Sequence, residues 1–495
     1  MTEKIGFNND LYVKEQSLKI KERLEMFGGK LYLEFGGKLF DDWHASRVLP
    51  GFDVNAKINL LMALREEAEL IICISAPSIE SSKMRDDMGI TYDMDALRLI
   101  DDLRKRGIYI GSVVITQYTG QPAADIFKNK LTKRGVRVYV HGLTKGYPSD
   151  VQKIVSDEGY GANPYIETTK PLVVVTAPGP GSGKLATCLS QLFHENKNGK
   201  KAGYAKCETF PVWDLPLQHP VNLAYEAATA DLKDVNMIDP FHLAAYNVTA
   251  VNYNRDIEVF PVVRAILKRI TGEDIYKSPT DMGVNAIGKC ITDDDVVKEA
   301  ACQEVIRRYF KAQCAFKKGE IDDETFNKNE LLMHTLGLTP DERSVVEPAL
   351  KKSKKSGASA VAIELSNGEI VTGKASQLMN STSSCILNSV KVLAGISDDM
   401  LLISPIVLEP IIRLKKEVLG SRYPVLTAEE VLIALSISAA TNPTAAMAVE
   451  ELRQLRGCEA HSSDIISSPD STTFRKLGIN ITCEPQYPTK SLYFR

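Results

Sequence analysis

The chain has 495 residues, of which 44% are hydrophobic and 25% charged, and its formal net charge is −3 at pH 7. A typical domain holds roughly 100–200 residues, so we expect about two to four domains. The small net charge argues against a general binder of nucleic acids or membranes, because the chain lacks the strong positive field that would attract either polyanion.

The N-terminal stretch MTEKIGFNNDLYVKEQ is polar and lacks the apolar segment of a secretory signal. No stretch reaches the roughly 18 apolar residues that span a membrane. The nine cysteines are scattered and form no Cys-x-x-Cys pair, which favours reduced thiols over disulfides or a zinc knuckle. We therefore expect a cytoplasmic protein that interacts with neither membrane nor nucleic acid, and a homo-oligomer by default.

Apolar, β-branched runs such as GGKLYLEF and AELIICISA alternate with segments of helical spacing over residues 28–145. Two of the expected helices end in Arg-Gly after a basic turn, which suits the negative end of a helix and a left-handed cap. Strand–helix alternation predicts an α/β fold with a doubly wound, mostly parallel sheet. We assign residues 1–170 to an N-terminal Rossmann-like α/β domain.

The next segment, residues 171–255, begins with the continuous apolar strand KPLVVVTA, which is fit for a sheet buried on both faces. A helix from about Lys184 to His194 and a strand in NGKKAGYAKCETF follow. This P-loop-like segment either forms its own sheet or extends the first one.

Helical patterns dominate residues 256–350, which we assign to a helical subdomain. Residues 351–495 are expected to form a C-terminal α+β domain. In this last part, Asn367-Gly368 predicts a two-residue hairpin turn. Thr427, which precedes two glutamates, predicts the start of a helix.

The stretch APGPGSGK lies between the expected strand and helix of the P-loop-like segment. A P-loop binds phosphate because backbone N–H groups and a helix N-terminus surround its oxygens, while a lysine adds positive charge. We expect the cradle and its helix to bind ATP or another phosphorylated ligand through the following residues: Gly179, Gly181, Ser182, Gly183, Lys184 and Thr187.

Two positions depart from the usual spacing of Gly, four residues, Gly-Lys and Ser or Thr. Pro178 stands at the first glycine, and Leu185 replaces the hydroxyl residue that normally ligates Mg²⁺. Ser182, Thr187 or water would have to substitute, or the site binds phosphate without this metal geometry. The use of Mg²⁺ is therefore open, and a structural turn with a solvated lysine is the alternative.

Glu208 follows the next expected strand and should emerge at the same carboxyl edge of the sheet, where ligands bind. Lys206 lies two residues earlier, on the same face of that strand. We predict both as catalytic residues together with Lys184; a surface ion pair between them is the alternative.

The loop KLFDDWHASRVLPGF offers His44 and Arg47, which at this spacing could grip a phosphate or carboxylate of a small-molecule substrate. A helix start capped by an aspartate explains the same residues equally well. No His-Glu-x-x-His, Gly-x-Ser-x-Gly or dinucleotide fingerprint accompanies them, and no metal-binding cluster is expected.

Four strings, GGKLYLEFGGKLFDDWHASRVLPGF, VVVTAPGPGSGKLATCLSQL, QHPVNLAYEAATADL and LIALSISAATNP, resemble an uncharacterised family of bacterial proteins of about this length. This domain-of-unknown-function family implies a multi-domain α/β fold, and its members have sometimes carried the label ATP-dependent peptidase. The absent metal motif speaks against that label.

The leading hypothesis is binding of ATP or a phosphorylated metabolite at residues 178–187, with phosphoryl transfer or nucleotide-dependent ligation as the reaction class. Lys184 would stabilise phosphate charge, and Glu208 would hold a metal or orient the acceptor. A non-catalytic ligand-binding or regulatory protein, and a structural homo-oligomeric scaffold, are the alternatives. Whether the chain is an enzyme stays open at this point.

Overall fold

The structure of the protein is a computed structural model that describes residues 4–85 and 88–489. It divides into two compact units, Lys4–Ala301 and the chain from Cys302 onward. Among the described residues, we find no helix with the length and apolar content that a membrane span requires.

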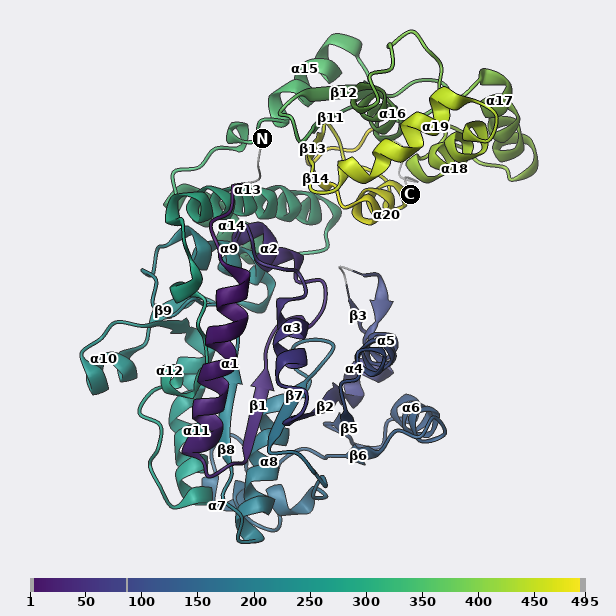
Figure 1. The fold of residues 1–495 in the computed structure, drawn as a ribbon. Helices are drawn as coiled ribbons and strands as arrows, with labels where there is room; N and C mark the ends of the chain where they lie inside the picture. Colours follow the sequence, from purple (N-terminus) through teal and green to yellow (C-terminus); the bar gives the residue numbers. More distant parts are fainter. Residues whose placement is uncertain (1–3, 86–87, 490–495) are drawn as a thin grey trace. The chain divides into compact units, whose positions relative to one another are not determined.

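The centre of the first unit is a six-stranded sheet whose neighbouring strands are all parallel (Figure 1). Its strands, in their order across the sheet, are β6 (Val138–Val140), β5 (Ile110–Thr116), β2 (Ala68–Ser75), β7 (Leu172–Thr176), β1 (Leu31–Phe35) and β8 (Gly203–Cys207). The predicted α/β class with a parallel sheet is thus confirmed. The P-loop-like strand β7 lies inside this sheet, so the segment does not form a sheet of its own.

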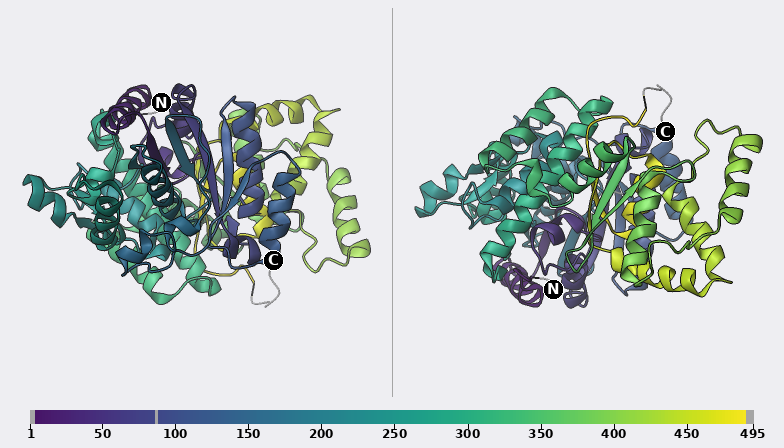
Figure 2. Two further views of the ribbon diagram at one scale, coloured as in Figure 1. Left: turned by 90° about the horizontal axis from the view of Figure 1, so that it is seen from below. Right: turned by 90° about the horizontal axis from the view of Figure 1, so that it is seen from above.

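Helices cover both faces of this sheet, as the side chains of β8 show. Alternate residues of a strand point to opposite faces. Cys207 receives a hydrogen bond from Gln16 of helix α1 (Asn9–Met26), whereas Lys206 pairs with Asp256 of helix α11 (Asn254–Thr271). The view from below shows the strands between two layers of helices (Figure 2).

The remaining helical elements of this unit are α2 (Trp43–Val48), α3 (Ala56–Ala63), α4 (Ala76–Glu80), α5 (Tyr92–Lys105), α6 (Pro122–Thr132), α7 (Val151–Ile154), η1 (Tyr160–Ala162), α8 (Lys184–Lys197), α9 (Pro220–Ala228), η2 (Ala230–Leu232), α10 (Pro240–Tyr246), α12 (Pro279–Met282) and η3 (Gly288–Cys290). Two antiparallel ribbons complete it, β3 (Met84–Arg85) with β4 (Ile90–Thr91), and β9 (Asn236–Ile238) with β10 (Val251–Tyr253).

The core forms around the two central strands because both are continuous apolar runs, and every residue of β2 and β7 is buried. The one charged residue of these two strands is Glu69, a fully buried carboxylate on β2. Its Oε1 accepts hydrogen bonds from the backbone N–H groups of Thr169 and Lys170, at 2.5 and 2.8 Å. These bonds compensate the loss of water that burial of a charge entails.

The second unit contains a mixed four-stranded sheet in the order β12 (Ile370–Lys374), β11 (Ala360–Glu364), β13 (Glu459–Ser462) and β14 (Asn480–Cys483). Its helical elements are α14 (Asp323–Thr335), η4 (Pro340–Glu342), α15 (Val346–Ser356), α16 (Ser381–Leu393), α17 (Pro405–Arg413), η5 (Leu414–Val418), α18 (Ala428–Ala439), α19 (Pro443–Glu451), η6 (Leu452–Leu455) and α20 (Ser468–Leu477). Helix α13 (Asp294–Lys318) continues from the first unit into the second. A helical region followed by a C-terminal sheet with helices therefore agrees with the expectation.

The hairpin predicted at Asn367-Gly368 joins β11 to β12, but its turn differs from the expected two-residue form. Only Gly368 has a positive φ, +84°, and its N–H donates to the carbonyl of Leu365. A four-residue turn that ends in a left-handed glycine needs no positive φ at Asn367. The helix start at Thr427 is confirmed by a capping box with Glu430.

Close packing between α1 and β8 depends on Gly203. A methyl group added there would lie 2.0 Å from the aromatic ring of Phe27. We expect Gly203→Ala to lower the free energy of unfolding by about 1–3 kcal/mol, because overpacking forces side chains from their rotamers. Urea unfolding measures this loss, and Phe27→Leu should restore part of it in the double variant. An unchanged stability of Gly203→Ala would contradict the packing described.

Candidate functional site

The carboxyl ends of β1 and β7 lie at the point where the chain changes direction across the sheet. From β1 the chain continues to β2, on the far side of β7, whereas from β7 it continues to β8, on the far side of β1. The connections thus run in opposite directions from two neighbouring strands. In open parallel sheets such a point opens a crevice where ligands bind.

The loop that follows β7 starts at this point of the sheet and ends at helix α8. Gly181 and Gly183 have φ angles of +72° and +79°, a region that favours glycine, and Gly183 is the N-cap of the helix. A methyl group at Gly183 would also lie 2.9 Å from the side chain of Thr116, at the end of β5. The backbone of this loop therefore requires glycine for both conformation and space.

Two side chains at the end of β5 bind the carbonyl groups of the loop. Thr116 Oγ1 donates to the carbonyl of Ser182 at 2.7 Å, and Gln117 Nε2 donates to that of Gly181 at 3.0 Å. In a trans peptide the C=O and N–H groups point in opposite directions. The N–H groups of Ser182 and Gly183 therefore point away from β5.

These N–H groups remain available as donors. Within the described residues, the backbone N–H groups of Ser182, Gly183 and Lys184 have no hydrogen-bond acceptor. They lie at the N-terminus of a 14-residue helix, which carries a partial positive charge. Donors, dipole and lysine together favour an anion at this point.

Lys184 is the first residue of α8, and its Nζ lies 3.8 Å from Oε1 of Glu34 on β1. Glu34 is 8% exposed and also accepts a hydrogen bond from the hydroxyl of Tyr204, at 2.9 Å. Burial, together with the negative charge of Glu34, raises the pKa of Tyr204 well above its usual value. Tyr204 is therefore a stable proton donor to this carboxylate.

Glu34 was not singled out by the sequence reasoning. The sequence did contain a signal, because Glu34 is a lone carboxylate within the apolar strand LYLEF. Its relation to the loop becomes visible only through the parallel pairing of β1 with β7 and β8. In that pairing Glu34 lies beside Lys206. The structure thereby connects two of the predicted residues, Lys184 and Lys206, through a residue that was not predicted.

Lys206 lies between two carboxylates. Its Nζ is 3.0 Å from Oε2 of Glu208 and 2.5 Å from Oδ2 of Asp256 on α11. Burial alone would lower the pKa of Lys206, but the charges of Asp256 and Glu208 raise it above its usual value. The amine is therefore protonated at neutral pH and is no nucleophile.

For Glu208, in contrast, burial outweighs the effect that the neighbouring positive charge has on the pKa. Burial raises its pKa, the positive charge of Lys206 opposes this effect, and the negative charge of Asp256 adds to it. Its side chain lies against the end of β1, where a methyl group at Gly36 would come within 2.5 Å of Glu208 Cγ. A carboxyl group with a raised pKa at this edge of the sheet is suited to hold or accept a proton.

The hydroxyl groups near the loop have different surroundings. Thr187 is buried, donates to the carbonyl of Gly183 at 3.0 Å and receives a hydrogen bond from Cys73 Sγ. Leu185 packs against the hydrophobic core. Ser182 Oγ is buried and has no hydrogen-bond partner among the described residues. Ser182 is therefore the hydroxyl of the loop that is best suited to a ligand, while Thr187 supports the backbone.

Asp42 and Lys57 brace the loop that follows β1. Lys57 is 2% exposed, and its Nζ donates to the carbonyl of Gly36 at 3.1 Å and to Asp42 Oδ2 at 3.2 Å. Burial would raise the pKa of Asp42, but Lys57 and then His44 lower it below its usual value. A buried ion pair thus fixes the loop that follows β1.

His44 and Arg47 lie on the short helix α2, whose N-cap is Asp42. The aspartate-capped helix start considered as an alternative is therefore present. His44 is buried between aromatic rings, with centroids 5.6 Å from Phe210 and 5.4 Å from Tyr225. Its role, and that of Arg47, in binding a substrate stays a prediction.

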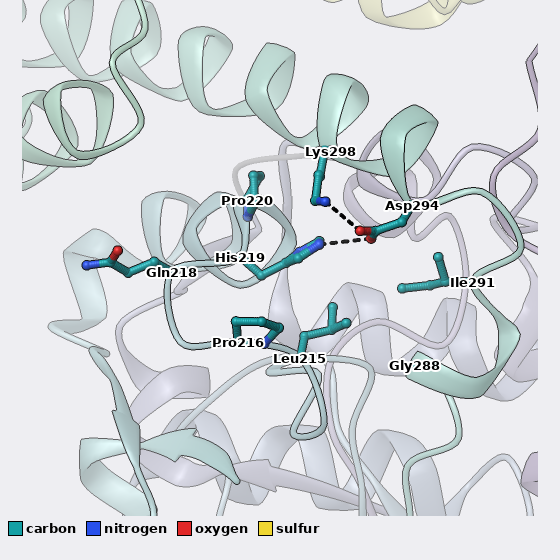
Figure 3. A pocket seen from close by; sticks show the side chains of 9 residues that line it. All are labelled: Leu215, Pro216, Gln218, His219, Pro220, Gly288, Ile291, Asp294 and Lys298. Atoms are coloured by element: carbon teal, nitrogen blue, oxygen red, sulfur yellow. Dashed lines mark hydrogen bonds and ion pairs between the residues drawn. The ribbon is translucent and has the colours of Figure 1, made fainter. Parts of the chain in front are cut away.

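A separate cavity of about 510 Å³ lies between residues 215–220 and the first turns of α13 (Figure 3). At its rim His219 Nε2 lies 3.0 Å from Asp294, which also pairs with Lys298 at 2.6 Å. The other ring nitrogen, Nδ1, accepts the N–H of Val221. Both nitrogens of His219 are occupied, so this histidine caps α9 and is not placed as a general base.

The arrangement of His242 differs from that of a peptidase triad. Its Nδ1 lies 3.0 Å from Ser278 Oγ and 3.7 Å from Asp281 Oδ1. A Ser–His–Asp triad requires the serine and the aspartate on opposite ring nitrogens. Among the described residues, we also find no group of three or more potential ligands that could hold a metal ion.

The sequence matches two family profiles that together span most of its length. One is described as "Domain of unknown function DUF1846, N-terminal" and covers residues 5–337, and the other as its C-terminal counterpart over residues 341–493. A "UPF0371 protein" of Clostridium tetani (strain Massachusetts / E88) is 61% identical over 500 residues, covering 99% of each chain. "UPF0371 protein" relatives from Clostridium botulinum strains Alaska E43 and ATCC 19397 are each 60% identical with the same coverage.

The buried ion pair of Lys57 with Asp42 predicts a specific dependence of stability on pH. Because the pKa of Asp42 is lowered in the folded state, its contribution is present above the usual aspartate range and is lost as the pH falls through the folded pKa. We expect Lys57→Met to lower the free energy of unfolding by about 3–5 kcal/mol at pH 7, because it leaves Asp42 buried and unpaired. This deficit should shrink toward pH 3.

Urea unfolding of wild type and of Lys57→Met at several pH values measures this deficit. Lys21→Met is the matched control, since it breaks the exposed pair with Glu67 and should cost about 1 kcal/mol or less. A deficit of Lys57→Met that stays constant down to pH 3 would mean that packing, and not charge, is lost.

Proposed function

The chain belongs to the DUF1846 family, and we propose that it binds the phosphate group of ATP or of another phosphorylated metabolite at the loop of residues 178–187. The observation that carries this proposal is the orientation of the loop. Its carbonyls are bound by Thr116 and Gln117, so its free N–H groups face away from them, at the N-terminus of α8.

The position of the loop supports the same ligand. It follows β7, one of the two strands at which the chain reverses its direction across the sheet. Lys184 supplies a positive charge there, and its Nζ lies 3.8 Å from Oε1 of Glu34. An incoming phosphate would compete with Glu34 for Lys184, in a site where burial strengthens each electrostatic contact.

Phosphoryl transfer or nucleotide-dependent ligation is the reaction class that we propose. In it Lys184 and the loop N–H groups stabilise the developing charge of the phosphate. Glu208, whose pKa is raised by burial, accepts the proton of the attacking group or orients the acceptor. Lys206 remains protonated and neutralises the carboxylates beside it.

A non-catalytic phosphate-binding protein is the second candidate, and Leu185 favours it. Its side chain packs against the core where Mg-dependent P-loops carry a hydroxyl that ligates the metal. Magnesium in this site would depend on Ser182, on water or on Glu34. Binding that is independent of Mg²⁺ and without turnover would therefore favour the second candidate.

The role of Lys184 can be measured by thermal unfolding with pyrophosphate and with ATP, each with and without Mg²⁺. A ligand that binds only the folded state raises the melting temperature. We expect such a shift in the wild-type protein and its near-complete loss in Lys184→Ala. Lys200→Ala, which removes the same charge from an exposed position after the same helix, should retain the shift.

Two results would contradict this proposal. One is the absence of any shift in the wild-type protein at millimolar pyrophosphate and ATP. The other is a shift of equal size in Lys184→Ala and wild type, since the ligand would then bind elsewhere. Hydrolysis of ATP that is lost in both Lys184→Ala and Glu208→Gln would favour the catalytic candidate over simple binding.

A further inference from the structure

The backbone donors of the loop of residues 178–187 continue beyond the N-terminus of α8. Within the described residues, the N–H groups of Gly179 and Gly181 also have no hydrogen-bond acceptor. In phosphate-binding loops, a series of N–H groups of this kind surrounds two successive phosphates. The loop therefore has donors for more than one phosphate group.

The first part of this loop is in contact with Tyr92, the first residue of helix α5. A methyl group added at Gly179 would lie 2.4 Å from both the Cζ atom and the hydroxyl oxygen of Tyr92. The ring is buried, so it could not move aside without disturbing its neighbours. The hydroxyl end of Tyr92 thus lies against Gly179 and positions the start of the loop.

Lys83 adds a positive charge beside the same ring. Its carbonyl accepts the N–H of Tyr92 at 2.9 Å, and its Nζ lies over the ring, 5.3 Å from the centroid. The ring of Tyr92 therefore separates this amine from Gly179. Lys83 is exposed and forms no ion pair within the described residues, so its charge is available to a ligand.

The carboxylates on the β1 side of the loop restrict where a second phosphate can lie. Glu34 is buried beside Lys184, and Glu208 follows β8, the strand next to β1. A second phosphate on that side would be repelled by both carboxylates, and burial strengthens such repulsion. The chain of phosphates is therefore expected to extend toward the other side, where the loop meets Tyr92.

The described carboxylates of α4 and α5 leave Lys83 available on that side. Asp95 is fully buried and is bound by two arginine side chains. Glu80 accepts a backbone N–H at 3.0 Å. Asp93 lies half-buried in the first turn of α5 and forms no ion pair with Lys83.

We propose that the loop binds a diphosphate group, as in pyrophosphate or a nucleoside di- or triphosphate, and that Lys83 contacts the second phosphate. This inference rests on the proposed phosphate site, in which Lys184 and the N–H groups at the start of α8 bind the first phosphate. The lysine amine is a compact charge on a flexible stem. An exposed cation–π contact is weaker than a charge-assisted hydrogen bond to phosphate, so the amine exchanges one for the other.

Isothermal titration calorimetry of the full chain with orthophosphate and with pyrophosphate tests this contact. We expect wild type to bind pyrophosphate about tenfold more tightly or better, because it gains a charge-assisted contact. Lys83→Gln should remove most of this preference and leave the affinity for orthophosphate within about twofold. Lys83→Arg, which keeps the charge, should retain most of it.

Lys133→Gln is the matched control, since it removes the same charge from an exposed position at the C-terminal end of α6. It should keep the preference of wild type. The melting temperature of Lys83→Gln without ligand should equal that of wild type, because the side chain is exposed.

The outcomes distinguish this inference from the proposed function. Pyrophosphate binding that Lys184→Ala abolishes and Lys83→Gln leaves unchanged would overturn the role of Lys83 and support the phosphate site. An equal loss of affinity for both anions in Lys83→Gln would overturn the contact with a second phosphate. A wild-type protein that binds neither anion at millimolar concentration would overturn the proposed function, and this inference with it.

Discussion

The carbonyl groups of Gly181 and Ser182 are bound by side chains from β5, and the candidate site depends on this interaction. A glycine-rich loop without such bonds could present its carbonyl oxygens to a ligand as readily as its N–H groups. With both carbonyls bound on the β5 side, the donors face the other way. The positive end of α8 and Lys184 then act on the same point as these donors.

Strand order makes this interaction possible. Because β7 lies between β2 and β1, the loop that follows it is close to the ends of strands that precede it by many residues. Glu34 of β1 pairs with Lys184 from one side, and Thr116 of β5 binds the loop from the other. Because Glu34 is buried and Lys206 and Asp256 are partly buried, the coupling between their charges is stronger than it would be in water. This edge of the sheet thus combines a donor-rich loop with a partly compensated cluster of charges.

The local features of the site could be predicted from the sequence. The apolar run before the loop, the glycines and the helix starting at Lys184 follow from periodicity and turn chemistry. The structure has β7 at Leu172–Thr176 and starts α8 at Lys184, although α8 continues to Lys197, beyond the expected end near His194. Glu208 was placed correctly at the end of the next strand because parallel strands end at one edge. Features that depend on residues close together in the sequence could thus be predicted.

Contacts between residues far apart in the sequence could not be predicted. Thr116 and Gln117 are more than sixty residues from the loop that they bind, and neither is unusual in its own segment. Glu34 and Asp256 acquire their importance only through the pairing of β1 with β8 and the docking of α11. His44 shows the same limit, because an aspartate-capped helix and a ligand grip have the same sequence pattern.

Hydrogen exchange of the loop amides, followed by mass spectrometry with and without pyrophosphate, tests directly whether these amides bind a phosphate group. The N–H groups of Ser182, Gly183 and Lys184 have no acceptor in the described chain, so they should exchange rapidly without a ligand. Pyrophosphate should slow exchange in the peptide over residues 177–188 in wild type and not in Lys184→Ala. Protection confined to other peptides, with rapid exchange at 177–188, would contradict it.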